Sequence, residues 1–230
     1  MSIKNKAINL IERQITKPAL VLETRAWHSG TFYEVDLHIP DADFSQFKGV
    51  SHIKCRVSPL TFRDYTISKW DDITKTCTLF VDAAHNGPGS AWVKTLSTQD
   101  QISYMQIETH RYPVMDQENY LFLGDQSTIG HFLALQQLAT KKAQISGAVV
   151  INNKIHQEEL RDYYPELSLT PVTLQQCHSQ TILTWLQNQS VNNYDMICLA
   201  GSSTMIVEVR QYLRKNGVPN NKIKTQGFWR

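Results

Sequence analysis

The sequence lacks several features that would assign a class of protein at once. No run approaches the roughly 18 uninterrupted apolar residues of a membrane span, and no Lys/Arg-rich block occurs in a chain of net charge +2. Proteins that bind nucleic acid normally concentrate basic residues on one face. The amino-terminal segment is polar and amphipathic, without the apolar centre of a signal peptide. We therefore expect a cytoplasmic monomer that binds neither nucleic acid nor a membrane.

Cysteine is scarce, and its spacing argues against a metal centre. The four cysteines are far apart and form no CxxC pair, whereas zinc and iron–sulfur sites use closely spaced cysteines. A disulfide framework has no support either, because such frameworks belong to small secreted domains. We expect no metal site, and we expect four buried thiols in a reducing compartment: Cys55, Cys77, Cys177 and Cys198.

The first half of the chain has the hydrophobic period of β-strands. Apolar and polar residues alternate in three runs, at 31–39, 52–58 and 74–83, with turn residues such as Pro40-Asp41 and Trp70-Asp71-Asp72 between them. This pattern is typical of an antiparallel barrel or sandwich. We expect an amphipathic helix before these runs, containing Ile8, Ile11 and Ile15, and a short helix at 90–97.

The pattern changes near residue 115, where apolar runs begin to alternate with helical segments. This alternation predicts a parallel sheet covered by helices on both faces. We therefore predict two domains, an antiparallel β-barrel over residues 1–114 and an α/β parallel-sheet nucleotide-binding domain over residues 115–230. The expected strands are 120–124, 147–151, 168–174, 194–200 and 222–229, and the expected helices are 129–142, 155–164, 179–189 and 203–216.

Two segments of the second half follow strands, at the edge where parallel sheets bind ligands. Residues 124–128 and 200–204 each run through glycine and small hydroxyl residues into a helix. Backbone N–H groups at such a junction can hold a phosphate. Neither segment is a GxGxxG fingerprint or a Walker loop, so each also fits an ordinary helix cap.

Two segments of the first half have the chemistry of a dinucleotide site. In a strand, Arg63 and Tyr65 share a face while Thr66 points to the other, and a guanidinium beside an aromatic ring suits phosphates and a flat ring. The alternative is a surface arginine beside a barrel-packing tyrosine. Residues 85–92 read HNGPGSAW. They predict a tight turn with exposed amides and a helix capped by Ser90, which suits a pyrophosphate or is a plain connection.

In order along the chain, these motifs resemble the siderophore-interacting protein family. This family comprises FAD-dependent ferric-siderophore reductases and belongs with the ferredoxin-reductase-like flavoproteins. Its RxYT and HGxxGPASxW motifs are similar to residues 63–66 and 85–92, and its GDET segment is similar to 124–128. The resemblance continues through residues 200–201 and 209–214 to GFWR at 227–230, which is similar to the family's GYWR.

The resemblance implies a role for each matching residue. Arg63 would bind the FAD phosphates, Tyr65 would stack on the isoalloxazine, and Thr66 would hydrogen-bond near its reactive nitrogen, so Tyr65 and Thr66 are the implied catalytic residues. The pyrophosphate segment contributes the implied cofactor-binding residues His85, Gly87, Gly89, Ser90, Ala91 and Trp92, with Gly87, Gly89, Ser90 and Ala91 acting through backbone amides. Asp125, Ser127 and Thr128 would lie at the mouth of the nicotinamide site. Trp229 would lie near the flavin.

The implied reaction carries electrons from NADPH or NADH through FAD to a ferric siderophore or other ferric chelate, releasing Fe(II) for iron acquisition. Lys54, Lys69 and His85 are candidates for a cationic rim that receives an anionic chelate. The sequence departs from the family at Gln126, where the family has Glu, and after Trp185-Leu186, where no cation follows to bind a 2′-phosphate. Two other functions stay open: a general NAD(P)H:flavin reductase or electron-transfer flavoprotein, and a siderophore-binding module that does not oxidise a nicotinamide.

Overall fold

The computed structural model describes residue 12, residues 14–109 and residues 116–229. The chain divides into two compact units, Met1–Pro113 and Val114–Arg230. The predicted boundary between residues 114 and 115 falls outside the described residues, and so do Ile8 and Ile11 of the predicted first helix.

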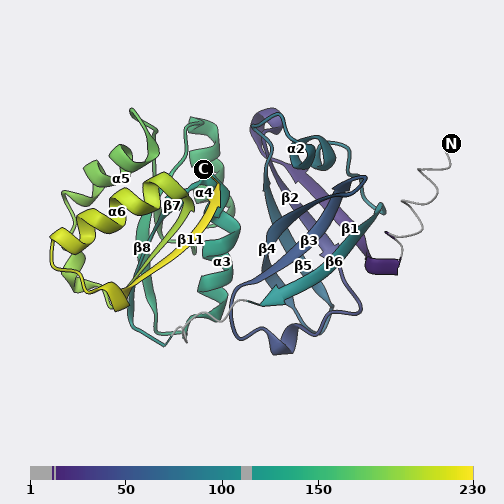
Figure 1. Ribbon diagram of the computed structural model, residues 1–230, viewed down its shortest axis with the longest axis horizontal. Coiled ribbons are helices and arrows are strands. Elements are labelled where there is room, and N and C mark those ends of the chain that lie inside the picture. The colour runs from purple at the N-terminus through teal and green to yellow at the C-terminus, as the bar shows by residue number, and fades with distance from the viewer. Residues whose placement is uncertain (1–11, 13, 110–115, 230) are drawn as a thin grey trace. The chain divides into compact units, whose positions relative to one another are not determined.

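The first unit is a closed barrel of six antiparallel strands (Figure 1). Around the barrel the order is β1-β2-β5-β4-β3-β6, and β6 pairs back onto β1 to close it. A short helix, α2 (Pro88–Val93), follows β5, and single 3-10 turns η1 (His28–Gly30) and η2 (Phe44–Gln46) lie in two connections. The strands are β1 (Lys17–Ala26), β2 (Phe32–His38), β3 (Ser51–Ser58), β4 (Thr61–Asp71), β5 (Thr76–Asp82) and β6 (Gln101–Thr109).

The barrel confirms the predicted architecture and corrects details of it. The three predicted runs are β2, β3 and β5, whereas β1 and β6 were not predicted as strands. The predicted turn at Trp70-Asp71-Asp72 is wrong in its start, because Trp70 and Asp71 still belong to β4. Alternate residues fill the barrel, as in β3, where Ile53 and Cys55 are buried and Lys54 between them is half-buried.

The second unit is a parallel five-stranded sheet in the order β11-β10-β7-β8-β9. Helices cover both of its faces (Figure 1). Leu121 and Leu123 of β7 pack in one cluster with residues of α5 and α6, whereas Phe122 between them stacks on Phe132 of α3. The elements are β7 (Asn119–Asp125), α3 (Ile129–Leu138), β8 (Gln144–Val150), α4 (Lys154–Tyr163), β9 (Leu169–Val172), α5 (His178–Leu186), β10 (Met196–Ser202), α6 (Ser203–Lys215) and β11 (Ile223–Trp229).

The five strands and four helices of this unit were all predicted, with errors at some ends. The helix predicted at 129–142 ends at Leu138, because Ala139 has extended backbone angles (φ −71°, ψ 155°). Among the described helices, none is long and apolar enough to cross a membrane.

The four cysteines do not share one environment. Cys55, Cys77 and Cys198 are buried, and burial raises the pKa of each thiol, that of Cys198 to about 12. Cys177 is exposed, so the prediction of a buried thiol is wrong there. It lies at the N-cap of α5, outside the core. In the part of the chain that the structure describes, no group of three or more His, Cys, Asp or Glu side chains is placed to hold a metal ion.

Candidate functional site

Residues from the two motifs of the barrel meet where β4 lies beside α2. A Cβ atom added to Gly89 in α2 would lie 2.6 Å from the Tyr65 hydroxyl oxygen and 3.8 Å from Cγ of Arg63. The rings of Tyr65 and Trp92 are stacked, with centroids 5.6 Å apart and planes 19° apart. The fold therefore joins Arg63, Tyr65, Gly89 and Trp92 into one cluster, which we call the β4–α2 site.

Tyr65 is held firmly within this site. Its half-buried ring packs against the barrel core, and Trp92 stacks on it. Burial raises the pKa of the Tyr65 hydroxyl, the nearby Cys55 raises it further, and Arg63 opposes the shift. The hydroxyl is therefore protonated at neutral pH and can donate a hydrogen bond.

Arg63 is the exposed cation of the site. One of its terminal nitrogens, Nη1, donates a hydrogen bond to the backbone carbonyl of Phe62 at 2.8 Å. Arg63 forms no ion pair with any carboxylate in the described residues. Its other guanidinium donors can therefore bind an anion, for which the planar fork is well shaped.

In the turn before α2, some of the backbone amides predicted to bind a pyrophosphate already have local hydrogen-bond partners. Gly87 donates its N–H to the His85 carbonyl at 3.2 Å, and Ala91 donates its N–H to the Gly87 carbonyl at 2.9 Å. Because the first amides of a helix have no partner within it, Gly89 and Ser90 are the two left for a ligand. The Gly87 and Ala91 amides thus have local partners in this structure, and their contacts with a pyrophosphate stay a prediction.

The start of α2 also corrects the predicted cap. Gly87 is the N-cap residue, and Pro88 occupies the first turn, where its fixed φ and missing N–H suit a helix. Ser90 is buried and lies inside the helix, so Ser90 does not cap α2. His85 is exposed, with Nε2 3.8 Å from a carboxylate oxygen of Asp82.

The remaining predicted barrel residues lie on β3 and β4. Thr66 is half-buried and pairs with His52 across the two strands, and its catalytic role stays a prediction. Lys54 forms an ion pair with Asp64 at 2.7 Å, so its charge is compensated within the barrel wall. Lys69 is exposed and has a positive φ of 49° at the irregular stretch of β4 between Ser68 and Asp71.

In the second unit, Asp125 joins the ends of two strands. Its carboxylate accepts hydrogen bonds from the backbone N–H and hydroxyl of Ser127 and from the backbone N–H of Ser202 at 3.0 Å. Burial raises the pKa of Asp125, and these hydrogen bonds oppose the shift. Gly201 has a φ of 106°, and a side chain there would collide with the Asp125 carboxylate.

These contacts give the predicted nicotinamide residues different environments. Thr128 is fully buried and donates its hydroxyl to the Asp125 carbonyl at 2.6 Å, so it shapes the loop from within. Ser127 is half-buried at the carboxyl end of β7. The predicted place of Asp125, Ser127 and Thr128 at the mouth of a nicotinamide site stays a prediction.

Two histidines near these strand ends were not singled out from the sequence. His156 of α4 is buried, and its Nδ1 lies 2.9 Å from the amide nitrogen of Gln126. His178 of α5 meets the ring of Trp229 edge-on, with centroids 5.2 Å apart. Trp229 is 37% exposed, and its predicted place near a flavin stays a prediction. No sequence motif marked either histidine, because each partner is distant along the chain.

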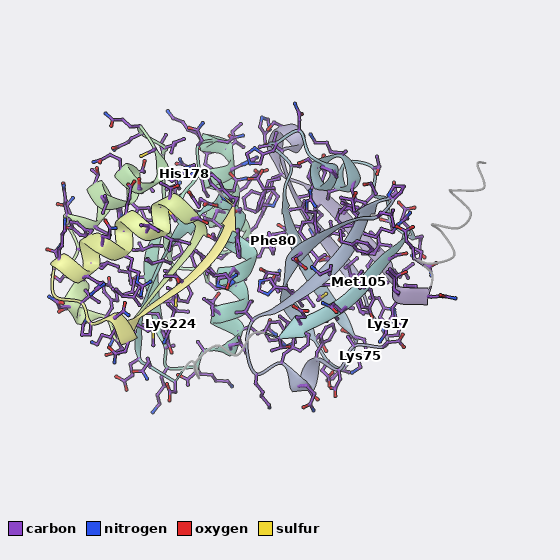
Figure 2. All side chains as sticks on the ribbon, in the orientation of Figure 1. Lys17, Lys75, Phe80, Met105, His178 and Lys224 are labelled. Carbon is purple, nitrogen blue, oxygen red and sulfur yellow. The ribbon has the colours of Figure 1, made fainter. Side chains whose placement is uncertain are left out.

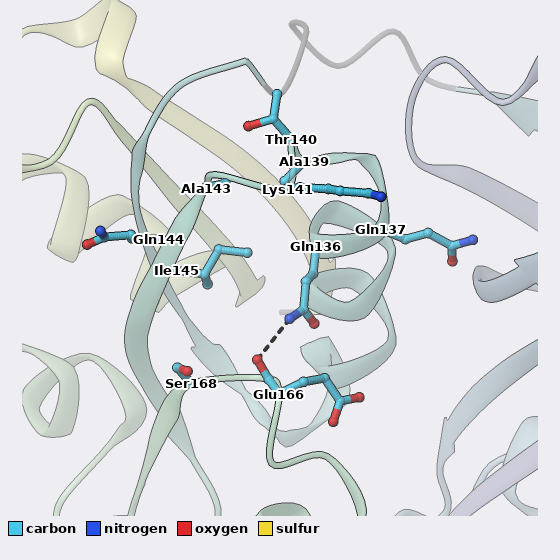
Figure 3. Close-up of a pocket in the computed structure, with 10 residues that line it drawn as sticks. All are labelled: Gln136, Gln137, Ala139, Thr140, Lys141, Ala143, Gln144, Ile145, Glu166 and Ser168. Carbon is cyan, nitrogen blue, oxygen red and sulfur yellow. Dashed lines mark hydrogen bonds between the residues drawn. The ribbon is translucent and has the colours of Figure 1, made fainter.

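A polar cavity of about 540 Å³ lies elsewhere in the second unit (Figure 3). The side chain of Gln136 crosses one side of it and donates to the backbone carbonyl of Glu166 at 2.8 Å. Gln144, the first residue of β8, and Ser168, directly before β9, also line it. It therefore lies at the amino ends of these strands, whereas open parallel sheets bind ligands at the carboxyl ends.

The two-domain fold is shared with solved structures over nearly the whole chain. A ferredoxin NADP+ reductase from Neisseria gonorrhoeae, with bound FAD and NADP, has a TM-score of 0.69 at 15% identity, covering 93% of this chain and 98% of its own. The siderophore-interacting protein from Acinetobacter baumannii has a TM-score of 0.75 at 13% identity, covering 94% and 90%. A siderophore utilization protein from T. fusca has 0.74 at 16% identity, covering 94% and 92%. The architecture is thus that of the ferredoxin-reductase-like proteins.

A match to a family model makes the assignment of the second unit more specific. Residues 117–230 match the model described as siderophore-interacting protein. The predicted resemblance to the siderophore-interacting protein family is thus confirmed over these residues.

Proposed function

We propose that the protein is an FAD-dependent oxidoreductase that passes electrons from NADPH or NADH to a ferric siderophore or other ferric chelate and so releases Fe(II). The observation that carries this proposal is the β4–α2 site, where Arg63 and Tyr65 meet Gly89 and Trp92. Family membership of residues 117–230 supports the proposal, as does the bound FAD and NADP of the Neisseria reductase of the same fold.

The residues of the β4–α2 site fit a dinucleotide that has a flat ring and a diphosphate. Arg63 offers guanidinium donors, and the amides of Gly89 and Ser90 offer two more donors to phosphate oxygens. The protonated Tyr65 hydroxyl donates a hydrogen bond, and its ring, supported by Trp92, offers an aromatic surface. When bound, FAD supplies the exchange between a hydride donor and an acceptor of single electrons.

The carboxyl ends of β7 and β10 are the proposed place of the nicotinamide donor. The hydrogen bonds of Asp125 to Ser127 and Ser202 hold the two ends together, and a preformed edge loses less conformational freedom on binding. Gln126 is neutral and hydrogen-bonded to His156. It therefore adds no negative charge that would repel the phosphates of the donor.

Two of the three cations predicted to receive an anionic chelate lie close to carboxylates. Lys54 forms an ion pair with Asp64, and His85 Nε2 lies 3.8 Å from a carboxylate oxygen of Asp82. This compensation favours one second candidate, a general NAD(P)H:flavin reductase that has no dedicated chelate site. Rapid reduction of free flavins, at rates above those for any ferric chelate, would support that candidate.

Anaerobic stopped-flow absorbance tests the proposal on the full chain loaded with FAD. NADH or NADPH should bleach the flavin band, and a ferric siderophore should then restore it while a coloured chelator traps Fe(II). A flavin that neither nucleotide bleaches would refute the oxidoreductase. Bleaching without recovery on any ferric chelate would refute the proposed acceptor.

Arg63→Ala tests the cofactor site directly. The variant should lose bound FAD, by about tenfold or more in affinity, because a charge-assisted hydrogen bond to phosphate is worth roughly 1.5–3 kcal/mol. Circular dichroism should show an intact fold, since Arg63 is exposed. Arg161→Ala, at an exposed arginine of α4, is the matched control and should keep its flavin. Full flavin occupancy in Arg63→Ala would remove this residue from the site.

A further inference from the structure

A cavity in the barrel lies at the end opposite the β4–α2 site. It has a volume of about 350 Å³ and is bounded by the start of β1, by residues 41–47 after β2, and by β6. His38 at the end of β2 pairs with Thr76 at the start of β5, and Phe32 pairs with Asp82 at the end of β5. Because α2 follows the end of β5, it lies at the other end of the barrel (Figure 1).

A largely buried tyrosine lines this cavity. Tyr104 of β6 is only 3% exposed and forms part of the barrel core, yet it also lines the cavity. Within the described residues its hydroxyl makes no hydrogen bond. A phenolic hydroxyl can both donate and accept a hydrogen bond. The cavity wall therefore contains a polar group that a bound molecule can use.

The rim of the cavity carries more negative than positive charge. Asp41, Asp43 and Lys17 all line it. Asp43 accepts a hydrogen bond from Ser45 at 2.5 Å, while the carboxylate of Asp41 has no hydrogen bond or ion pair within the described part of the chain. Asp41 is also close enough to Tyr104 to reinforce the effect of burial, which raises the pKa of that hydroxyl. A cation would gain from this arrangement, and an anion would be repelled.

Part of the cavity wall is apolar. Phe47, Ile107 and Ala42 line it, and Phe47 is fixed by edge-on contacts with Phe44 and Trp70. Figure 2 labels two of the lining residues, Lys17 and Met105, on the barrel. A volume of about 350 Å³ is at the small end of ligand pockets, which are mainly apolar with a few convergent polar groups.

We propose that this cavity binds a small organic amine, in which a protonated amino group is attached to an apolar body about the size of one ring. The ammonium would donate hydrogen bonds to the Asp41 carboxylate and to the Tyr104 oxygen. The apolar body would pack on Phe47 and Ile107. Such a ligand differs in charge from a nucleotide and from an anionic ferric chelate, so this site is separate from the proposed function.

Isothermal titration calorimetry on the full chain tests this proposal with three probes of similar shape: benzylamine, benzyl alcohol and benzoate. Benzylamine should bind with a stoichiometry of one, benzyl alcohol at least about tenfold more weakly, and benzoate not at all. Added salt should weaken benzylamine binding, because the contact is ionic. Equal binding of the three probes, or none by benzylamine up to about 10 mM, a very weak affinity, would overturn the proposal.

Single substitutions locate the site. Tyr104→Phe removes only the hydroxyl and should weaken benzylamine about tenfold, and Asp41→Asn should do the same. Tyr33→Phe makes the identical change at a half-buried tyrosine of β2 and should leave binding unchanged. If Tyr104→Phe does not fold, the exposed Asp41 still provides the test. Wild-type affinity in Asp41→Asn, or a loss in Tyr33→Phe equal to that in Tyr104→Phe, would place the amine elsewhere. Flavin absorbance of each variant reports the proposed function independently.

Discussion

The close approach of Gly89 to Tyr65 yields a sharp test of the β4–α2 site. In Gly89→Ala the new methyl carbon would lie 2.6 Å from the Tyr65 hydroxyl oxygen, which is too close for any real contact. The backbone of α2 can accommodate the substitution, because alanine has a higher helix propensity than glycine. The tyrosine must therefore retreat, and its stacking on Trp92 must change.

The magnitude follows from these two opposing effects. Replacing glycine by alanine within a helix stabilises it by about 1 kcal/mol, and crowding a packed site costs about 1–3 kcal/mol. The free energy of unfolding should therefore fall by less than about 2 kcal/mol. Disturbing an aromatic pair is worth about 0.5–1.5 kcal/mol, so FAD affinity should fall by about twofold to tenfold.

The assay is titration of the flavin-free protein with FAD, followed by flavin fluorescence, alongside urea unfolding of each variant. Gly87→Ala is the matched control, because nothing lies within 4 Å of a Cβ atom added there and its amide already binds the His85 carbonyl. It should weaken FAD less than Gly89→Ala does. Equal affinities for wild type and Gly89→Ala would refute the inference that Tyr65 must be held in place to bind the flavin.

Three further predictions concern single side chains. Asp125→Ala should lower the free energy of unfolding by about 1–3 kcal/mol, because it leaves the buried Ser202 amide without an acceptor; a urea midpoint like that of wild type would contradict this. Although burial opposes it, the hydrogen bond and ion pair with Arg56 hold the pKa of Glu12 below its usual range. The stability that Glu12 adds is therefore present above its unfolded-state pKa and is lost as the pH falls through its lower folded-state pKa. The difference in free energy of unfolding between wild type and Glu12→Gln should therefore shrink from pH 7 to pH 3. A difference that grows would contradict this role for Glu12. Cys177 is exposed, and its hydrogen bond with Ser179 lowers its pKa, so a thiol reagent should modify one cysteine rapidly in the native protein and the other three only after unfolding; rapid modification in Cys177→Ser would contradict the assignment.

The period of the hydrophobic pattern was enough to predict the architecture. Alternation over residues 52–58 indicated one buried face, and β3 has it. Five short apolar runs separated by helical segments indicated a parallel sheet, which the second unit forms. Burial imposes a period of two on a strand and 3.6 on a helix, so these elements leave a local trace in the sequence. The strand β6 was missed, although Ile102 and Tyr104 are its buried residues.

Contacts between residues far apart in the sequence needed the tertiary structure. The sequence identified Arg63, Tyr65 and the turn before α2 as separate motifs, and only the folded barrel brings the Tyr65 hydroxyl against Gly89. The local amino-acid sequence likewise could not reveal that Asp64, on the neighbouring strand, forms an ion pair with Lys54. Residue types and spacings thus determined the class of fold and the family. Strand register and close packing decided which amides, charges and hydroxyls remain available, because each depends on a partner that the local sequence does not specify.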